Sequence, residues 1–318
     1  MRPSMSSPSY VEPSRMAELV PPKLIATLFP HLPRDSHRSY RLALVLGSAT
    51  IVVLAVFRLF PVALIAAALL LPLLVALYLV EVNVYGDEPV WALSLTMGWG
   101  AVAGVGFGLL ALAVAPTAAS VIVNGTSQYL LVQGLVLPFC GFFVLLLGPL
   151  VLLRYQHFNT VLDGVTFGAS TGAAFSGAQA ITYSAHLLGA GLRPGGAVLP
   201  WVWRLLSLGL GMPIVTMGAA AAACAALWLR YRAPARDAQA LGALGHPAVA
   251  LPLAGLLVAG AAVGETFLSA GGWLVWLVAF DVVAISLLAQ TIHVGLLEEA
   301  AATDPGGPSL GSALEGPS

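Results

Sequence analysis

Ionisable side chains that stand inside apolar runs are the residues of this sequence that could do chemistry. Three of them lie in its C-terminal half: Arg204, Glu265 and Asp281. Each is a functional candidate, because a charge at the centre of a membrane helix costs about 2.5–3.5 kcal/mol on insertion scales. Arg204 and Glu265 have similar predicted depths, so they form either an interfacial ion pair between two helices or part of a catalytic site. Asp281 has no partner evident from depth, and is either a hydrogen-bonded structural group or a functional acid.

Histidines are the second group that could do chemistry, as metal ligands. A zinc site needs several ligands that converge, for instance two histidines four residues apart on one helix, and no His-Glu-x-x-His pair occurs. His186 stands at the outer end of an apolar run and His293 near the inner end of the last one. For each alone we expect an interfacial or hydrogen-bonded role. No cofactor is therefore expected, and a divalent metal such as zinc would be needed only by an active hydrolase.

The clearest periodic pattern lies within residues 164–188, where small residues recur at every fourth position. They are Gly164, Gly168, Gly172, Ser176, Ala180 and Ser184. Such a ridge lets the backbone of another helix approach closely, which predicts a buried, central helix. A second row with the same spacing contains Phe175 and Gln179. An amide in mid-membrane must find a hydrogen-bond partner, so we expect Gln179 to face the bundle interior.

The composition identifies the environment in which these residues work. Of 318 residues, 59% are hydrophobic and 8% are charged, with a mean hydropathy of +0.93. A soluble domain has about 25% charged residues, so this is a membrane protein and the lipid bilayer is its first partner. Thirteen basic and fourteen acidic residues give a net charge of -1. That balance leaves no basic surface for nucleic acid, which we exclude as a partner.

The apolar runs predict an all-α, polytopic bundle of about eight transmembrane helices. A helix that crosses ~30 Å of hydrocarbon takes about 20 apolar residues. The predicted spans cover residues 42–59, 62–80, 90–113, 129–153, 164–188, 202–229, 248–268 and 273–296. The connection at residues 58–61 is either a loop or a kink between two short helices. Residues 115–128 are a candidate interfacial segment.

The distribution of Lys and Arg predicts the orientation of the bundle. With a cytoplasmic N-terminus, only Arg58, Arg193 and Arg204 of the thirteen basic residues fall on the outer side. This bias places both termini in the cytoplasm. Residues 1–40 lack the apolar core of a signal peptide and are expected to form a disordered tail, residues 41–297 the transmembrane domain and residues 298–318 a second disordered tail. The Ala-rich, Arg-over-Lys composition favours a bacterial cytoplasmic membrane.

The stretch from residue 137 to residue 183 resembles the core of the PrsW family of glutamate-dependent intramembrane proteases, which are proposed metalloenzymes. Members have a Pro-x-x-Glu-Glu-x-x-Lys helix, an Asp-Gly-x-x-Tyr-Gly motif and then Gly-x-Gly-Phe-x-x-x-Glu-Asn-x-x-Tyr. The matching residues are Pro138, the basic turn at 154–157, Asp163-Gly164, Phe167-Gly168, Gly172, Phe175 and Tyr183. Residues 211–216 are similar to the family's Gly-His-Pro-x-x-Thr. The resemblance covers about residues 30–225, and its N-terminal part is similar to actinobacterial members.

The departures from the family pattern fall on the residues that carry its chemistry. Gly141 and Phe142 stand at the paired glutamates, Leu145 at the lysine, Gln179 at the third glutamate and Met212 at the histidine. Glutamine cannot act as a general base, and the other four bring neither carboxylate nor imidazole. The resemblance therefore implies a catalytically degenerate pseudoprotease that binds membrane-protein helices, possible partners being single-span proteins. The expected contact residues are Gly164, Gly168, Gly172, Ser176, Phe175 and Gln179.

Two other functions stay open at this point. The first is an active intramembrane peptidase whose acid and base have moved to Asp281, Glu265, His186 or His293, which requires that these side chains converge on one cavity. The second is a small proton-coupled transporter built around Asp281. The sequence has no evident internal repeat and few polar residues along a pathway, and both features count against transport.

Overall fold

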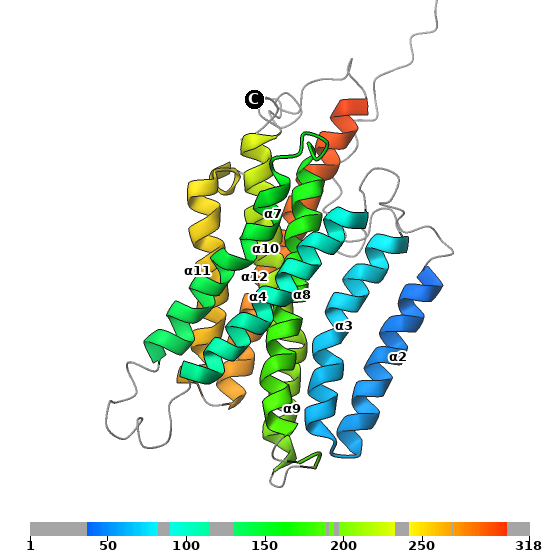
Figure 1. Cartoon of the computed structure of the whole chain (residues 1–318), viewed down its shortest axis with the longest axis vertical. Helices are drawn as coiled ribbons and strands as arrows, with labels where there is room; N and C mark the ends of the chain where they lie inside the picture. Colours follow the sequence, from blue (N-terminus) through cyan, green and yellow to red (C-terminus); the bar gives the residue numbers. More distant parts are fainter. Residues whose placement is uncertain are drawn as a thin grey trace, which may run out of the picture.

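The structure, a computed structural model, describes residues 37–81, 90–114, 130–188, 191–193, 197–232, 242–268 and 270–303. All regular elements within these ranges are helical, and they run side by side along the long axis of the molecule (Figure 1). The first half contains α2 (His37–Val56), α3 (Phe60–Glu81), α4 (Val90–Val114), the π-helix η2 (Leu130–Val136) with α7 (Leu137–Leu152), and α8 (Val161–Leu188). The second half contains α9 (Val198–Leu206), the π-helix η3 (Ser207–Gly211), α10 (Met212–Tyr231), the short η4 (Gly242–Gly245), α11 (Pro247–Phe267) and α12 (Ala270–Thr303).

These elements join into rods that match the eight predicted spans, because η2 continues into α7 and α9 continues through η3 into α10. Six of the rods are long and apolar enough to cross a membrane. α2 has a shorter apolar stretch, and α8 is not one of the six. The chain is therefore an all-α, polytopic membrane protein. The bounds differ most from the prediction at two places: α2 begins at His37 instead of residue 42, and α12 continues to Thr303 instead of ending at residue 296.

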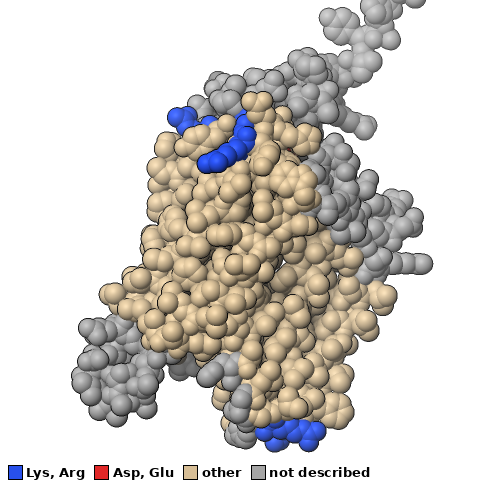
Figure 2. Space-filling view, in the orientation of Figure 1, with Lys and Arg blue, Asp and Glu red and all other residues tan. Residues whose placement is uncertain are grey.

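Charged side chains concentrate at the two ends of the bundle. Arg154, Arg230 and Arg232 follow or end helices at one end, whereas Arg58 and Arg193 lie in connections at the other. Figure 2 shows Lys and Arg at both ends of one face and an uncharged band between them. A band without charge is what lipid tails require of the surface that they cover. The predicted interfacial segment at residues 115–128 lies outside the described residues.

The connection between α2 and α3 is a tight turn, so these are two separate helices. Arg58 has a φ of 59°. Its amide donates to Ala55 O at 3.0 Å, and the Leu59 amide donates to Leu54 O at 2.9 Å. This pair of bonds is the Schellman arrangement, in which a left-handed residue ends the helix and supplies donors to its last carbonyls. α2 then packs along α3, and the Leu70 side chain of α3 lies against Gly47 of α2.

α8 is the central helix, as its small-residue ridge predicts. A β-carbon on Gly172 would stand 2.8 Å from the carbonyl oxygen of Thr216, and one on Gly164 would stand 2.9 Å from the ring of Trp228, both on α10. Gly168, between them, faces the backbone at Ala220. The ridge therefore packs directly on α10, and it does so because glycine leaves room for backbone-to-backbone contact.

A second glycine row, on α4, packs on another face of α8. Gly100 lies against the carbonyl of Thr171, Gly104 against the backbone of Phe175 and Gly108 against the side chain of Thr182. These three glycines are also spaced by four residues, so they form one face of α4. On yet another face of α8, a β-carbon on Gly177 would stand 2.7 Å from the carbonyl of Ala68 on α3.

The two π-helical turns share one physical origin. η2 contains Gly134, four residues before Pro138, and η3 contains Gly209, four residues before Pro213. In a regular α-helix the proline ring collides with the carbonyl four residues earlier and cannot bond to it. Widening the preceding turn to the π geometry removes this collision. In η3, Gly209 also lies against Ala67 of α3. Both rods thus remain continuous across a proline.

Candidate functional site

The Asp163-Gly164 pair at the start of α8 has a structural explanation. The Thr160 amide donates to Asp163 Oδ2 at 2.9 Å, and the Asp163 amide donates to Thr160 Oγ1 at 3.2 Å. This reciprocal arrangement is a capping box, which satisfies backbone donors at a helix start. The next residue, Gly164, gives space to the Trp228 ring. Helix capping and packing therefore account for both residues of the pair.

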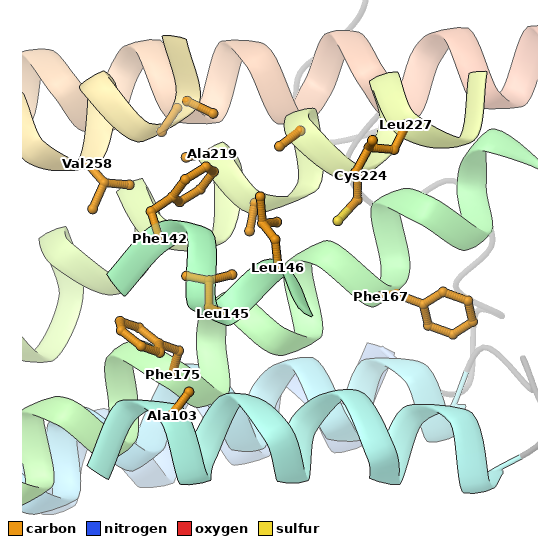
Figure 3. Close-up of a cluster of buried hydrophobic side chains, with 14 of the residues drawn as sticks. Ala103, Phe142, Leu145, Leu146, Phe167, Phe175, Ala219, Cys224, Leu227 and Val258 are labelled. Atoms are coloured by element: carbon orange, nitrogen blue, oxygen red, sulfur yellow. The ribbon is translucent and has the colours of Figure 1, made fainter. Parts of the chain in front are cut away.

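The three positions that the sequence resemblance matches to paired glutamates and a lysine, Gly141, Phe142 and Leu145, lie on α7 in the bundle core. A β-carbon on Gly141 would stand 3.2 Å from the rings of Phe107 and Phe175. Phe142 and Leu145 are fully buried within the main apolar cluster. Figure 3 shows both side chains in this cluster between Ala219 on one side and Phe175 on the other.

The remaining two family positions lie next to the same core. Met212, at the histidine position, is the first residue of α10 and packs against the apolar cluster. Gln179 lies one helical turn after Phe175 on α8, and its backbone oxygen would be 3.3 Å from a β-carbon on Gly108. Gln179 is half-buried on α8, and its expected inward orientation stays a prediction.

This arrangement determines what the family positions can do in this chain. Phe142, Leu145 and Met212 contribute only apolar surface, and Phe107 and Phe175 fill the space beside Gly141. Activation of a water molecule requires a base or a metal ion with an open coordination position. None of these side chains supplies either function, so the chemistry open to this region is packing.

Asp281 lies on the inner side of α12. The buried residues of that helix include Leu277, Ala284 and Leu288, a helical spacing that also includes position 281. Asp281 Oδ2 is 3.2 Å from the position of a β-carbon on Gly211, the last residue of η3. The other carboxylate oxygen, Oδ1, is buried and has no hydrogen-bond partner.

The other relocated candidates do not join Asp281 where their side chains are described. His293 is half-buried on the same helix, twelve residues later, which corresponds to about 18 Å at 1.5 Å per residue. The side chains of His186 and Glu265 lie outside the described residues. Arg204 lies over the rings of Tyr183 and Trp201, with centroid distances of 5.8 and 5.6 Å. Among the described residues, no three His, Cys, Asp or Glu side chains come close enough to hold a metal ion.

Three polar side chains that sequence reasoning missed connect neighbouring rods. The Trp99 indole donates to Val144 O at 3.0 Å, and the Trp276 indole donates to Gly260 O at 2.8 Å. Gln133 of η2 donates to Ala111 O of α4 at 2.9 Å. Each donor reaches a backbone carbonyl of a neighbouring rod. The available signal was their polarity within apolar runs, because a polar group in hydrocarbon must find a partner.

Comparison of the chain with protein-family models, with curated proteins and with solved structures returns no match.

Proposed function

We propose that this chain is a PrsW-like membrane protein with a degenerate catalytic centre, which binds the transmembrane helices of other proteins without cleaving them. The observation that supports this proposal is the kind of side chain found on α7 and α10 at the positions matched to the catalytic residues. Phe142, Leu145 and Met212 share one apolar core with Phe175. The matched positions on α7 and α10 thus border one apolar core, and they carry side chains that only pack.

The ridge on α8 is occupied by α10, so a bound helix needs another contact surface. The outer side of α4 offers one. Gly98 and Gly106 are exposed, and a β-carbon on either would meet no atom within 4 Å. Val102 lies between them, four residues from each, and is 67% exposed. Glycines on a lipid-facing side let a second helix approach closely, as in other membrane helix pairs. We assign the helix-binding role to this face.

The proposal includes a location and an orientation. The bundle end that carries Arg154, Arg230 and Arg232 is the cytoplasmic end, in accord with the positive-inside rule. α2 begins and α12 ends on that side, which supports the proposed cytoplasmic position of both termini. The membrane is the bacterial cytoplasmic membrane, as the composition favours.

The experiment combines a binding assay with a cleavage assay. The full chain is reconstituted in lipid nanodiscs with a panel of labelled single-span helices, and energy transfer reports association. Mass spectrometry of the helices reports cleavage, and elemental analysis reports bound metal. The variant pair Gly98→Leu and Gly106→Leu fills the proposed face. Val282→Leu and Val283→Leu on α12 serve as controls, because both valines are exposed and lie on another rod.

We expect association with some helices, no cleavage and no bound metal. The glycine variants should weaken association at least about tenfold, equivalent to about 1.4 kcal/mol, and the valine variants should leave it unchanged. Cleavage that disappears in Asp281→Ala would instead establish a relocated catalytic centre. Association that is equal in the glycine and valine variants would exclude α4 as the binding face, and absence of any association would contradict the binding role itself.

A further inference from the structure

Asp281 and the π-helical turn η3 face each other within the bundle. Oδ2 of Asp281 is 3.2 Å from the position of a β-carbon on Gly211, and Oδ1 is buried without a partner. Asp281 stands eleven residues after the start of α12, which corresponds to about 16 Å from that end of the bundle. A buried carboxyl at this depth needs either a counter-charge or a proton.

The backbone of η3 offers an acceptor at this level. The Met212 amide donates to Ser207 O, five residues earlier. In a regular α-helix the Met212 amide would donate to the Leu208 carbonyl, four residues earlier, but here it donates to Ser207. The amide five residues after Leu208 cannot replace it, because Pro213 has no N–H. A carbonyl inside hydrocarbon that lacks its helical partner must receive a hydrogen bond from elsewhere.

A carboxyl group and a free carbonyl are complementary only when the carboxyl is protonated. An ionised carboxylate is purely an acceptor, whereas a carboxylic acid has one O–H that can donate. Two acceptors facing each other repel, and the buried charge adds its own desolvation cost. The arrangement of Asp281 and η3 thus favours the neutral acid.

The surrounding charges do not reverse this preference. α12 packs against α8, α9, η3, α10 and α11. The titratable and charged groups on these helices and on α12 itself are Asp163, Tyr183, His186, Arg204, Cys224, Arg230, Tyr231, Glu265, His293, Glu298 and Glu299. Among those whose side chains are described, none forms an ion pair with Asp281. Of the two arginines on these elements, Arg204 lies over Tyr183 and Trp201, and Arg230 is exposed in the last turn of α10.

We propose that Asp281 and η3 form a proton-binding site inside the membrane domain, in which the protonated carboxyl donates a hydrogen bond to the Leu208 carbonyl. When the proton leaves, the O–H bond breaks, the electron pair stays on the carboxylate and the proton passes to water. The inference concerns this site alone, and it holds whether or not the chain binds other helices.

Infrared spectroscopy of the full chain in lipid nanodiscs tests the site directly. The probe is the C=O stretch of a protonated carboxylic acid, followed as a function of pH. We expect a band that disappears as pH rises in the wild type, remains in Asp163→Asn and is missing in Asp281→Asn. Asp163 is the matched control because it caps α8 near the end of the bundle. An unchanged titrating band in Asp281→Asn, or its absence from the wild type at every pH, would overturn the proposal.

A second variant tests the role of η3. Pro213→Ala restores an N–H that can bond to the carbonyls freed by the proline, and so removes the acceptor that favours the protonated form. The midpoint of the Asp281 titration should then move to lower pH by about one unit. A midpoint that stays unchanged, or moves to higher pH, would overturn the assignment of η3 as part of the site.

Discussion

Gly172 on α8 lies against the carbonyl oxygen of Thr216 on α10, so close that a β-carbon on the glycine would stand 2.8 Å from that oxygen. The neighbouring atom belongs to the backbone, so it cannot move to make room for a larger residue as a flexible side chain can. The contact belongs to a row, since Gly168 meets the backbone of Ala220 in the same way one turn earlier. The two helices at the centre of the bundle are held at a separation that only glycine permits.

Enlarging Gly172 should therefore separate α8 from α10. We expect Gly172→Val to lower the free energy of unfolding by roughly 1–3 kcal/mol, the usual cost of overpacking, measured by SDS titration in mixed micelles. Gly106→Val is the control, because a β-carbon on Gly106 meets no atom within 4 Å. Equal effects of the two substitutions would contradict the packing of α8 on α10.

The capping box of α8 gives a second prediction. Thr160→Ala removes the acceptor of the Asp163 amide and should cost about 1 kcal/mol, seen as faster hydrogen exchange in the first turn of α8. Asn159→Ala, at an exposed neighbouring position, should leave exchange unchanged. Asp163→Asn retains a side-chain oxygen that can accept and should stay close to the wild type. A large loss of association with other helices in Asp163→Asn, with exchange unaltered, would argue for a role beyond capping.

Trp99 connects α4 to α7, and its loss should weaken that pair. In Trp99→Phe the hydrogen bond to Val144 O is absent while most of the ring volume remains. The expected decrease in unfolding free energy is about 0.6 kcal/mol, the average contribution of hydrogen bonds between membrane helices. Trp91→Phe, with its exposed ring against Tyr155, is the comparison. If Trp91→Phe were the more damaging of the two, the hydrogen bond would not be the source of the effect.

Arg232 ties the end of α10 to the end of α7. Its guanidinium Nη2 donates to Leu153 O, a carbonyl just past the last turn of α7. Arg232→Ala should speed hydrogen exchange at residues 153–158 several-fold, because that turn loses its contact with α10. Arg230→Ala removes an exposed charge from the same helix end and should not change exchange there. Identical exchange in Arg232→Ala and the wild type would show that the turn is held by its own packing.

Sequence patterns predicted much of this fold, for reasons that can be named. The central place of α8 followed from Gly164, Gly168 and Gly172, because small residues on one helical face have little use at a lipid surface. The π-helical turns did not follow, although Gly209 and Pro213 are visible in the sequence. A proline can equally kink or end a helix, and the choice depends on the helices that pack beside it.

The candidate site was predictable to the same limited degree. The apolar character of positions 142, 145 and 212 could be read directly from the sequence, whereas their common core depends on how α7 and α10 pack. The neighbour of Asp281 could not be predicted from depth, because the group that faces it belongs to the backbone at Gly211. Every residue has a backbone carbonyl, so the sequence does not indicate which of them faces Asp281.

The position of α8 has a consequence for how the protein is made. α8 is buried on several faces, yet it is not among the helices apolar enough to cross a membrane by length and composition. Insertion of such a weakly apolar helix into lipid is only weakly favourable when the helix first leaves the ribosome. α10, which covers its glycine ridge, is synthesised later. We expect α8 to remain at the insertion machinery until α10 arrives, so that the two helices enter the bilayer as a pair.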